Sequence, residues 1–389
     1  MCQKIEMGFI MEYREVGKTG KKVSVISLGC EHLDKKPYSQ VKETVDAAIE
    51  HDVNLLDVFM PGAEVREFIA KAIGNRRNKV MIQGHIGASD VNQQYDISRD
   101  LPTVKKYFEN LLRLFGGYID FGMLFFIDTE ANYRDIFETD FVNYAEQLKK
   151  QGDIGHIGFS SHNPEMAIKA INTGVPEMFM FSVNPAFDML PSTEYVFDHM
   201  EDSFGNKLFK GIDPRRAELY KLCEQKQIGI TVMKTLGVGK LISKEHTPFG
   251  KPMTVPQCIH YALTRPAVAA VLPGCQSAAE VKDVMKYFDT DDLERDYSEI
   301  ISSGKNDFKG SCVYCSHCQP CPAGIDIAAV MKFLDIACLD KDNIPPLIKS
   351  HYKNLAFKGS DCTKCGHCEN RCPFDVPVMK NMSEAETLM

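Results

Sequence analysis

The chain has 389 residues, of which 44% are hydrophobic, and carries a formal net charge of −8. This length suffices for one large domain and a small one, because single hydrophobic cores stop growing near about 250–300 residues. An acidic chain without a block of Lys and Arg argues against nucleic acid and favours small molecules or proteins as partners. No apolar run reaches the roughly 18–20 residues of a membrane span. Residues 1–10 lack the long apolar core of a signal peptide, so we expect a cytoplasmic protein.

Eight short apolar runs alternate with amphipathic stretches between Val23 and Tyr287. Each run has about the length of a strand and is rich in β-branched or aromatic residues. The runs are Val23–Leu28, Val53–Val58, Val80–Ile82, Ile119–Ile127, Ile154–Phe159, Met178–Val183, Ile228–Met233 and Val268–Leu272. Helical periodicity lies between them, for example over Val41–Ile49 and Val104–Phe115. This alternation predicts an α/β fold, a (β/α)8 TIM barrel, whose usual length of about 250 residues fits the segment.

An open, doubly wound sheet is the alternative fold with the same alternation. It carries a Gly-rich phosphate-binding turn after its first strand, and residues 28–32, which read Leu-Gly-Cys-Glu-His, lack that pattern. After Asn184 a long connection runs to a helix expected near Arg215. Long loops that follow the C-terminal end of a barrel strand are typical of lids and partner surfaces.

The charged stretch from Asp289 to Lys309 separates the barrel from a cysteine-rich segment. We therefore expect a barrel domain over residues 11–290 and a second domain over 291–389. Two cysteine motifs lie in the second domain, Cys312-x2-Cys315-x2-Cys318-x2-Cys321-Pro322 and Cys362-x2-Cys365-x2-Cys368-x3-Cys372-Pro373. In a chain without a signal peptide, clustered cysteines indicate metal ligands rather than disulfides.

Three cysteines at two-residue spacing bind one [4Fe–4S] cluster, and a fourth cysteine followed by proline binds the other cluster. By this rule one cluster is held by Cys312, Cys315, Cys318 and Cys372, and the second by Cys362, Cys365, Cys368 and Cys321. A pair of zinc sites is the alternative, although zinc needs four sulfurs per site and no distant partner. The motifs resemble those of bacterial dicluster ferredoxins. The pattern of Ile325–Tyr352 predicts helix between them, hence a small ferredoxin-like domain of helices and loops.

Five barrel segments occur in a specific order: residues 13–20, 54–57, 154–160, 232–241 and 272–274. In that order and spacing they resemble the aldo/keto reductase family, in its branch with a C-terminal ferredoxin domain. The resemblance covers nearly the whole chain. It implies carbonyl chemistry in which a tyrosine donates a proton and a nicotinamide donates hydride. An aspartate, a lysine that lowers the pKa of the tyrosine and a histidine that orients the carbonyl complete the family's site.

Only Asp57 matches that catalytic set. The tyrosine position falls on residues 61–62, which read Pro-Gly, and His85 stands at the lysine position. The histidine position falls on Phe125, and Met180 stands where the family has the glutamine that binds the carboxamide. The resemblance therefore implies that the usual Tyr, Lys and His are absent and that tight NADPH binding is in doubt.

Some cofactor positions of the family are kept, and Ser160 and Asn184 are candidate cofactor-binding residues. Barrels also bind a flavin phosphate on the loops after strands seven and eight. The candidates there are Gly237, Gly239 and Gly274 as a cradle and Lys234 for an anionic substrate or cofactor group, with a solvated surface lysine as the alternative. No Arg or Lys clamp for a 2′-phosphate follows Gly274. The cofactor hypotheses are thus two [4Fe–4S] clusters, with NAD(P)H or a flavin as doubtful additions.

Asp57 and His85 are the candidate catalytic residues, because both lie at the carboxyl ends of predicted strands, which meet at one mouth, and histidine titrates near neutral pH. The alternative is a hydrogen-bonded His85 that fills the space of the lost lysine. His32, His85 and His162 with Asp57 also form a candidate divalent metal set, against which stand separately hydrogen-bonded histidines.

These observations support three functional hypotheses. The first is an iron–sulfur oxidoreductase that acts on a small carbonyl-like substrate, with electrons passing through the clusters and a redox protein as candidate partner. The second is a catalytically silent barrel that serves as a binding or electron-transfer module. The third is an NAD(P)H-dependent carbonyl reductase with structural clusters. A hydride carries two electrons and a cluster accepts one, so a direct transfer between nicotinamide and cluster would need a flavin-like intermediary.

Overall fold

The computed structural model describes residues 10–92, 94–189, 212–302 and 310–389. Eight parallel strands form one sheet in the order β12-β11-β10-β9-β8-β5-β4-β3. Their bounds are β3 Leu28–Gly29, β4 Leu55–Val58, β5 Met81–Ile86, β8 Ile119–Leu124, β9 Ile154–Ser161, β10 Met178–Ser182, β11 Gly229–Met233 and β12 Val268–Val271. Bridges from Ile26 to Val271 and from Gly29 to Gly274 join the two edges, so the sheet closes. The predicted barrel is confirmed and the open sheet is excluded.

One predicted strand is wrong in its bounds. The run Val23–Leu28 is split between β2 (Lys22–Ser24), which pairs antiparallel with β1 (Tyr13–Glu15), and the two-residue barrel strand β3. Ser27 helps to stabilise the turn between β2 and β3, because its hydroxyl donates to the carbonyl oxygen of Ser24 at 2.8 Å. Apolar content alone did not reveal this hydrogen bond, and the first barrel strand is consequently much shorter than expected.

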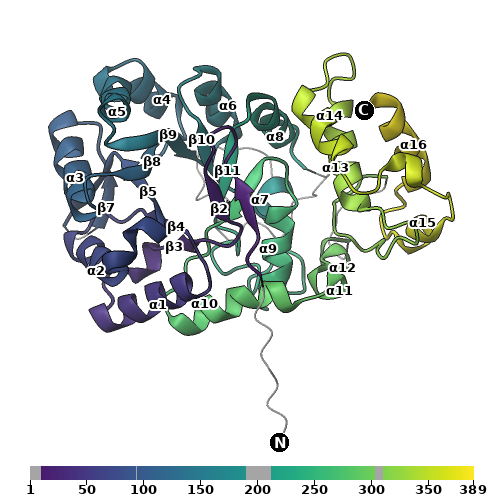
Figure 1. Cartoon of the computed structure of the whole chain (residues 1–389), viewed down its shortest axis with the longest axis horizontal. Coiled ribbons are helices and arrows are strands. Elements are labelled where there is room, and N and C mark those ends of the chain that lie inside the picture. The colour runs from purple at the N-terminus through teal and green to yellow at the C-terminus, as the bar shows by residue number, and fades with distance from the viewer. Residues whose placement is uncertain (1–9, 93, 190–211, 303–309) are drawn as a thin grey trace, which may run out of the picture.

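Helices cover the outside of the barrel (Figure 1). Their bounds are α1 Tyr38–Glu50, α2 Ala63–Ile73, α3 Leu101–Leu114, α4 Glu130–Phe137, α5 Asp140–Gln151, α6 Pro164–Asn172, α7 Pro185–Met189, α8 Pro214–Lys226, α9 Val255–Leu263 and α10 Ala278–Met285. Four begin with a capping side chain followed by a proline in the first turn, and these caps are Asp100, Asn163, Asp213 and Thr254. Helices α1, α3 and α8 match the segments predicted as helical, except that Phe115 lies one residue past the end of α3.

A hairpin of β6 (Ala88–Val91) and β7 (Gln94–Ile97), which the sequence pattern did not predict, follows the barrel strand β5. Its Tyr95 ring packs against Phe59, with the ring centroids 4.9 Å apart. Short 3-10 turns complete the described elements, and they are η1 Glu31–Leu33, η2 Gly74–Lys79, η5 Lys286–Asp289 and η6 Gly359–Asp361.

The end of the barrel opposite its mouth is closed by the β1–β2 hairpin. The Lys18 amide donates to the carbonyl oxygen of Gln227 at 2.9 Å. A Cβ atom on Gly229 would lie 2.5 Å from the backbone nitrogen of Gly17, so only glycine permits this contact. The mouth at the carboxyl ends of the strands is thereby left as the open end of the barrel.

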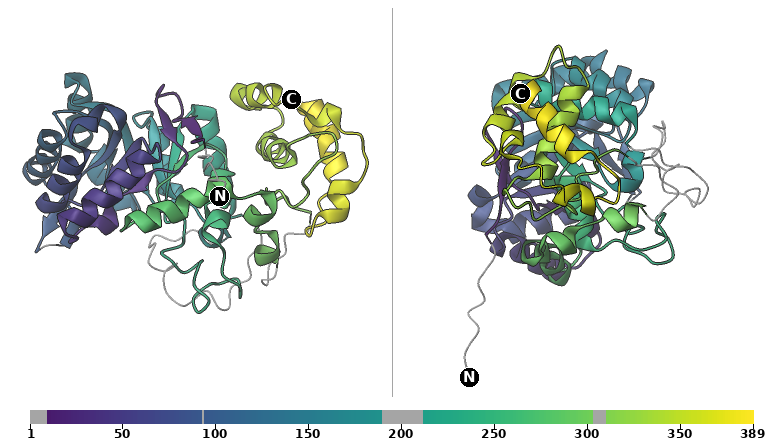
Figure 2. Two further views of the ribbon diagram at one scale, coloured as in Figure 1. Left: turned by 60° about the horizontal axis from the view of Figure 1, so that its bottom comes forward. Right: turned by 90° about the vertical axis from the view of Figure 1, so that its right-hand side faces the viewer.

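The C-terminal part forms a lobe beside the barrel, next to α8 and α9 (Figures 1 and 2). Its helices are α11 Asp292–Arg295, α12 Ser298–Ser302, α13 Ile327–Cys338, α14 Pro346–Lys353, α15 His367–Arg371 and α16 Val378–Leu388. The predicted helical segment Ile325–Tyr352 contains α13 and the first part of α14. Most of the long connection after Asn184 and the end of the predicted domain boundary lie outside the described residues.

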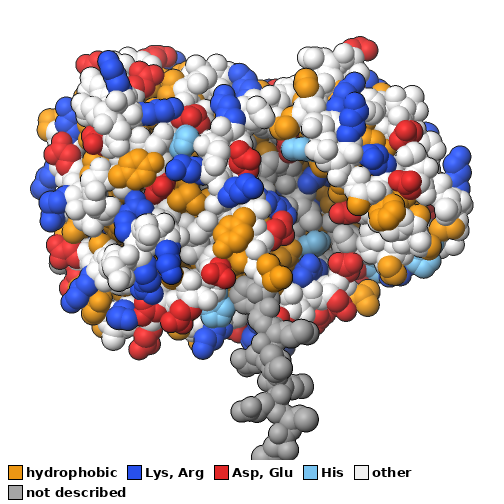
Figure 3. Space-filling view, viewed as in Figure 1, with side chains coloured by type: hydrophobic (Ala, Val, Ile, Leu, Met, Phe, Trp, Pro, Cys, Tyr) orange, Lys and Arg blue, Asp and Glu red, His pale blue; other side chains and the backbone are white. Residues whose placement is uncertain are grey.

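Charges of both signs are interspersed over the face of the molecule in Figure 3. This distribution agrees with the sequence, which has no block of basic residues. Among the described helices, none has both the length and the apolar character that crossing a membrane requires.

Candidate active site and cysteine-lined cavities

The two cysteine motifs enclose two cavities in the C-terminal lobe, each of about 360 Å³ and partly open to solvent. The first is lined by Cys312, Cys315, Cys318 and Cys372, and the second by Cys321, Cys362, Cys365 and Cys368. Each cavity thus combines three cysteines of one motif with the last cysteine of the other motif. Ile327 of α13 and Val378 of α16 line both cavities and separate them with apolar side chains.

Left-handed backbone residues curl each motif around its cavity. Tyr314 and Ser316 have φ values of 58° and 63°, and both lie between cysteines of the first motif. Lys364 and Gly366 have φ values of 56° and 75° in the second motif. Alternation of right- and left-handed residues turns successive amide groups toward one concave side, which is the geometry of anion-binding nests.

The chemistry of the donor set fits a thiolate-bound metal cluster. Burial raises the pKa of Cys315 and Cys318 to about 12, so these thiols are protonated unless a metal displaces the proton. Across the described ranges, no three His, Cys, Asp or Glu side chains are grouped in the way that a single metal ion requires. The thiols instead surround a cavity, which suits a polynuclear group better than a zinc ion.

The first cysteine motif is anchored to the barrel through the carbonyl oxygen of Val313. Tyr297 donates its hydroxyl to this oxygen at 2.7 Å, and Arg265 donates from Nη2 at 2.8 Å. The Arg265 guanidinium also lies 4.6 Å from the centre of the Tyr314 ring. Because Arg265 lies between α9 and β12, the first cysteine motif is fixed directly to the barrel wall.

Asp57 and His85 lie together inside the barrel, where β4 and β5 are neighbours. The His85 Nε2–H donates to Asp57 Oδ1 at 2.8 Å, and the two side chains are 2% and 5% exposed. Gln83 donates to the same carboxylate oxygen at 2.8 Å and accepts a hydrogen bond from Thr231 at 3.1 Å. The second ring nitrogen of His85, Nδ1, has no hydrogen-bond partner among the described residues.

Aromatic rings cover this pair. Phe59 and Phe125 each contact the His85 ring edge-on, with ring centroids 5.5 Å apart in both cases. Phe59 and Phe125 also touch each other, at 5.1 Å between centroids. The Asp57–His85 pair is therefore in a dry environment, one layer below the mouth.

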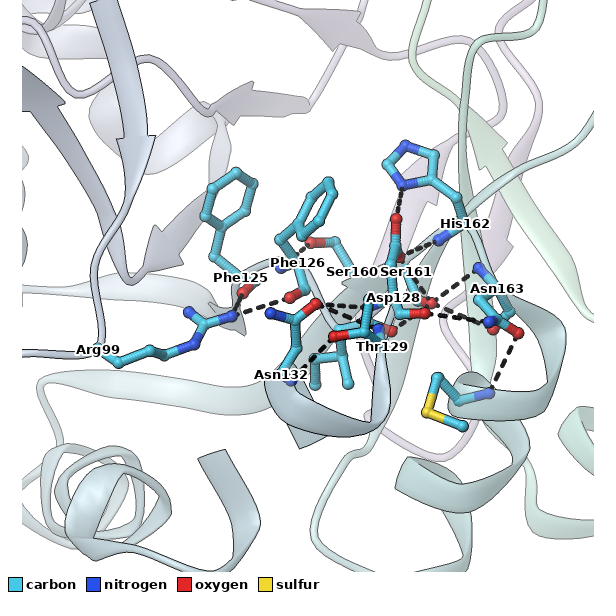
Figure 4. Close-up of polar contacts among 12 residues, drawn as sticks. Arg99, Phe125, Phe126, Asp128, Thr129, Asn132, Ser160, Ser161, His162 and Asn163 are labelled. Atoms are coloured by element: carbon cyan, nitrogen blue, oxygen red, sulfur yellow. Dashed lines mark hydrogen bonds and ion pairs between the residues drawn. The ribbon is translucent and has the colours of Figure 1, made fainter. Parts of the chain in front are cut away.

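A second aspartate–histidine pair lies at the carboxyl ends of β8 and β9 (Figure 4). The His162 Nδ1–H donates to Asp128 Oδ2 at 2.8 Å, and the His162 amide donates to Asp128 Oδ1 at 2.7 Å. Ser161 donates its hydroxyl to the same Oδ1 at 3.1 Å. Burial lowers the pKa of His162, although the negative charge of Asp128 acts to raise it. The sequence suggested His162 only as part of a candidate metal set, and its pairing with Asp128 was not predicted.

The turn that carries Asp128 is held by its own hydrogen bonds. Thr129 caps α4 and exchanges hydrogen bonds with Asn132, whose side chain also accepts from the Asp128 amide at 3.3 Å. Arg99 donates to the carbonyl oxygens of Phe125 and Phe126 at 2.8 and 2.9 Å. These contacts fix Asp128 so that its carboxylate faces His162.

The candidate cofactor residues have structural partners. The Ser160 hydroxyl accepts from the Phe126 amide at 3.0 Å. Asn184 donates from Nδ2 to the carbonyl oxygen of Lys234 at 3.0 Å and accepts from the Phe187 amide at 2.9 Å. Both side chains therefore shape the strand ends, whatever else they bind.

The three candidate cradle glycines lie on the loops after β11 and β12. Gly237 and Gly239 have φ values of 58° and 81°, which a turn of this kind takes up most easily with glycine. A Cβ atom on Gly274 would lie 2.4 Å from the ring of His32, so glycine here makes room for that histidine. His32, His85 and His162 are not brought together as one metal set within the described residues.

Residues 25–258 match the sequence profile of the Aldo/keto reductase family, which is more than half of the chain. The chain belongs to the aldo/keto reductase family. Its family is one of oxidoreductases. The matched residues lie within the barrel, and the cysteine lobe lies outside them.

Solved aldo/keto reductases share the barrel fold. The enzyme AKR11C1 from Bacillus halodurans, in its holo form, superposes with a TM-score of 0.57 at 19% identity, covering 75% of this chain and 96% of that one. An aldo-keto reductase from Pseudomonas aeruginosa gives a TM-score of 0.56 at 17% identity, covering 74% and 99%. At such identities the likeness establishes the aldo/keto reductase fold, and the chemistry has to be argued from this chain's own residues.

Proposed function

We propose that this aldo/keto reductase is an iron–sulfur oxidoreductase that acts on a small carbonyl-like substrate in the barrel mouth. One observation carries the proposal: each cavity of the C-terminal lobe is lined by three cysteines of one motif and the fourth of the other. This crossed arrangement is the one that two [4Fe–4S] clusters with interleaved ligands require. We also propose a cytoplasmic location and a redox protein as the electron donor.

The side chains that would hold the two clusters are the four cysteines of each cavity. When bound, the clusters would supply one-electron transfer, and protein groups around them would set their potential. The lobe contributes an apolar wall from Ile327 and Val378, and Arg265 and Tyr297 keep the first motif against the barrel.

In the barrel, we propose that Asp57 and His85 handle protons. Reduction of a carbonyl group to an alcohol takes up two electrons and two protons, so a proton donor is needed whatever the electron source. Asp57 accepts from His85 Nε2 and fixes the ring, which leaves Nδ1 as the nitrogen that exchanges a proton. Phe59 and Phe125 exclude water from the pair.

The clusters are the proposed electron source because residues expected to bind a nicotinamide already have hydrogen-bond partners within the barrel. Ser160 accepts from the Phe126 amide, and Asn184 bonds through both its amide nitrogen and its oxygen. Met180, at the carboxamide position, accepts a weak hydrogen bond from Gln83 at 3.3 Å. These contacts favour electron supply through the cysteine lobe over hydride transfer.

The test is metal and sulfide analysis of the full chain purified without oxygen, with EPR after reduction. We expect about eight irons and eight acid-labile sulfides per chain. Cys321→Ala and Cys362→Ala should each halve the iron and remove the same EPR signal, whereas Cys372→Ala and Cys312→Ala should remove the other signal. Cys338→Ala is the matched control, since this exposed cysteine lies outside both cavities.

Zinc without acid-labile sulfide in the wild-type protein would refute the proposal. If Cys321→Ala removed the same signal as Cys312→Ala, each motif would bind its own cluster and the crossed arrangement would be wrong.

A further inference from the structure

The two cysteine-lined cavities differ in what surrounds them. Among their eight cysteines, all of which the structure describes, Cys365 of the second cavity is exposed, Cys315 and Cys368 are buried, and the other five are half-buried. Thr363 and Lys364, which precede Cys365, are exposed as well. Figure 1 shows α15, which follows this turn, on the outer side of the lobe, whereas α12 lies on the side next to the barrel. The second cavity therefore presents a cysteine to solvent on the side away from the barrel.

The first cavity is in contact with the barrel. Tyr297 and Arg265 both donate to the carbonyl oxygen of Val313, at 2.7 and 2.8 Å. From Arg265 the contact continues inward, because its guanidinium lies 4.2 Å from the centre of the Tyr261 ring and the Tyr261 hydroxyl donates to Asp188 at 2.9 Å. Asp188 belongs to α7, which follows the carboxyl end of β10. A chain of direct contacts thus leads from the first motif to a strand end of the barrel.

An exposed aromatic side chain lies near the second cavity. Phe357 is 48% exposed, and among the described Phe and Tyr residues of the lobe it alone is exposed. A Cβ atom on Gly324 would lie 3.0 Å from the Phe357 ring, so the ring packs against that glycine. The Gly324 amide donates to the carbonyl oxygen of Cys321 at 2.9 Å, and Cys321 lines the second cavity. Aromatic side chains are enriched among the anchors of protein–protein interfaces.

Positive charge is concentrated around the second motif. Residues 349–371 contain five basic and two acidic side chains, which are Lys349, Lys353, Lys358, Lys364, Arg371, Asp361 and Glu369. Residues 311–331, which include the first motif, contain no Lys or Arg, and the whole chain has a net charge of −8. The Tyr352 hydroxyl accepts from the Gly359 amide at 2.9 Å, so the end of α14, with the exposed Lys353, lies against the turn that precedes the second motif. An acidic protein would be attracted to this side of an otherwise acidic molecule.

We propose that a docking surface formed by Lys353, Phe357, Lys364 and Cys365 binds an acidic one-electron carrier protein, so that electrons enter the lobe at the second cavity and leave it toward the barrel from the first. In each encounter the carrier is oxidised by one electron and the chain is reduced by one, and no bond is made or broken. Two encounters supply the electron pair that reduction of one carbonyl group takes up. The inference rests on the proposed function, since electron entry requires clusters in both cavities. It deepens that function by naming the class of the donor and the place where it binds.

The experiment measures binding and reduction of the full chain, purified without oxygen, with a plant-type [2Fe–2S] ferredoxin as the acidic carrier. Titration calorimetry gives the affinity, and stopped-flow mixing gives the rate at which reduced ferredoxin bleaches the visible absorption of the chain. Both quantities should fall as the salt concentration rises, because screening weakens the attraction between charges. The methyl viologen radical, a small reductant that needs no docking surface, is the control for the reduction step.

Variants of the docking surface should weaken binding and slow reduction by ferredoxin. Lys364→Glu and Lys353→Glu should each lower the affinity and the second-order rate about tenfold at low salt, because electrostatic steering changes association rates by about 10–1000-fold. Neither should slow reduction by methyl viologen. Phe357→Ser should lower the affinity without changing its salt dependence. Lys150→Glu is the matched control and should change neither quantity, since this exposed lysine belongs to α5, on the side of the barrel away from the lobe (Figure 1).

Iron content is measured for every variant. Lys353 lies outside both cysteine motifs, so Lys353→Glu tests the docking surface even if Lys364→Glu lowers the iron content. The order of the two cavities is tested by rapid freezing and EPR. Cys362→Ala, which removes a ligand of the second cavity, should lose the fast reduction of its remaining signal by ferredoxin, whereas Cys312→Ala should retain it. The reverse result would place electron entry at the first cavity and overturn the order.

Ferredoxin that failed to bind the wild-type chain at low salt, or that bound it and both lysine variants equally, would overturn the docking surface. That result would leave the proposed function intact, provided that iron and acid-labile sulfide are present. A chain without clusters would instead refute the proposed function and the electron route together. The binding titration would still decide in that case whether an acidic carrier docks on this surface.

Discussion

The buried carboxylate of Asp188 joins three helices of the barrel through hydrogen bonds. Its carboxylate is fully buried and accepts from Arg216 Nε at 2.7 Å, from the Tyr220 hydroxyl at 2.8 Å and from the Tyr261 hydroxyl at 2.9 Å. These donors come from α8 and α9, so one side chain joins α7 to two outer helices. Buried polar groups must find such partners, and where they do not, as with the second nitrogen of several histidines, stability becomes dependent on pH.

His260 should make the protein sensitive to mild acid. Burial lowers the pKa of His260 to about 4 from its ordinary value of 6.5, helped by the charges of Arg295, Arg265 and Arg14 and opposed by Asp296. Below pH 6.5 His260 is protonated in the unfolded chain, whereas in the folded chain it stays neutral down to about pH 4. Stability should therefore fall by roughly 2–3 kcal/mol as the pH falls through this range.

Urea unfolding at pH 7 and at pH 4.5 would measure this loss. His260→Gln, which is uncharged at both pH values, should reduce the difference between the two unfolding free energies. If the unfolding free energy of the variant differed as much between the two pH values as that of the wild type, the acid sensitivity would come from other groups.

At the scale of elements, the first cysteine motif depends on the end of α9. Arg265 donates to the carbonyl oxygen of Val313 and lies between the rings of Tyr261 and Tyr314, 4.2 and 4.6 Å from their centres. Tyr297 donates to the same oxygen. The first cysteine motif is thus held in part by a barrel residue, and this contact joins the lobe to the barrel.

Arg265→Met should loosen this attachment. Removing the charged donor should cost about 2–3 kcal/mol of unfolding free energy, because hydrogen bonds to charged groups are the stronger class. Hydrogen exchange of residues 312–318 should accelerate more than that of the barrel strands. Arg215→Met is the control, since the ion pair of Arg215 with Glu218 is exposed to solvent and should contribute little to stability.

Across the whole molecule, the barrel and the lobe differ in what stabilises them. The barrel interior is filled by apolar side chains such as Phe121, Met123 and Met178, all fully buried. The lobe packs its helices around two cavities lined by cysteines, and small domains usually need metals or disulfides to complete their stability. Binding of the proposed clusters is therefore expected to contribute to the folding free energy of the lobe.

Removal of iron should unfold the lobe while the barrel persists. After oxidation and chelation under conditions that strip iron and sulfide, we expect protease cleavage within residues 310–389 and a resistant fragment that contains the barrel. Loss of far-ultraviolet circular dichroism should be limited to the helical signal of the lobe. Simultaneous cleavage of barrel and lobe would show that the two parts unfold as one unit.

Much of the fold was predictable because the eight strands carry a repeated apolar signal. The split of Val23–Leu28 and the β6–β7 hairpin were not, since a single serine hydrogen bond and a local turn decide them. The crossed cysteine groups were predictable from spacing, and the structure places the same four thiols around each cavity. The contact between Asp57 and His85 was also expected from the strand order, and it is present.

The sequence by itself determined the barrel, the two cysteine sets and the family, because periodicity and ligand spacing are local properties of the chain. Only the tertiary structure decided which polar groups are left without partners. The pairing of Asp128 with His162, the hydrogen bond of Asn184 to the Lys234 carbonyl oxygen and the aromatic cover over His85 each depend on strands that are distant in sequence. Whether a side chain is satisfied or available for chemistry is set by such neighbours, and sequence order does not specify their distances.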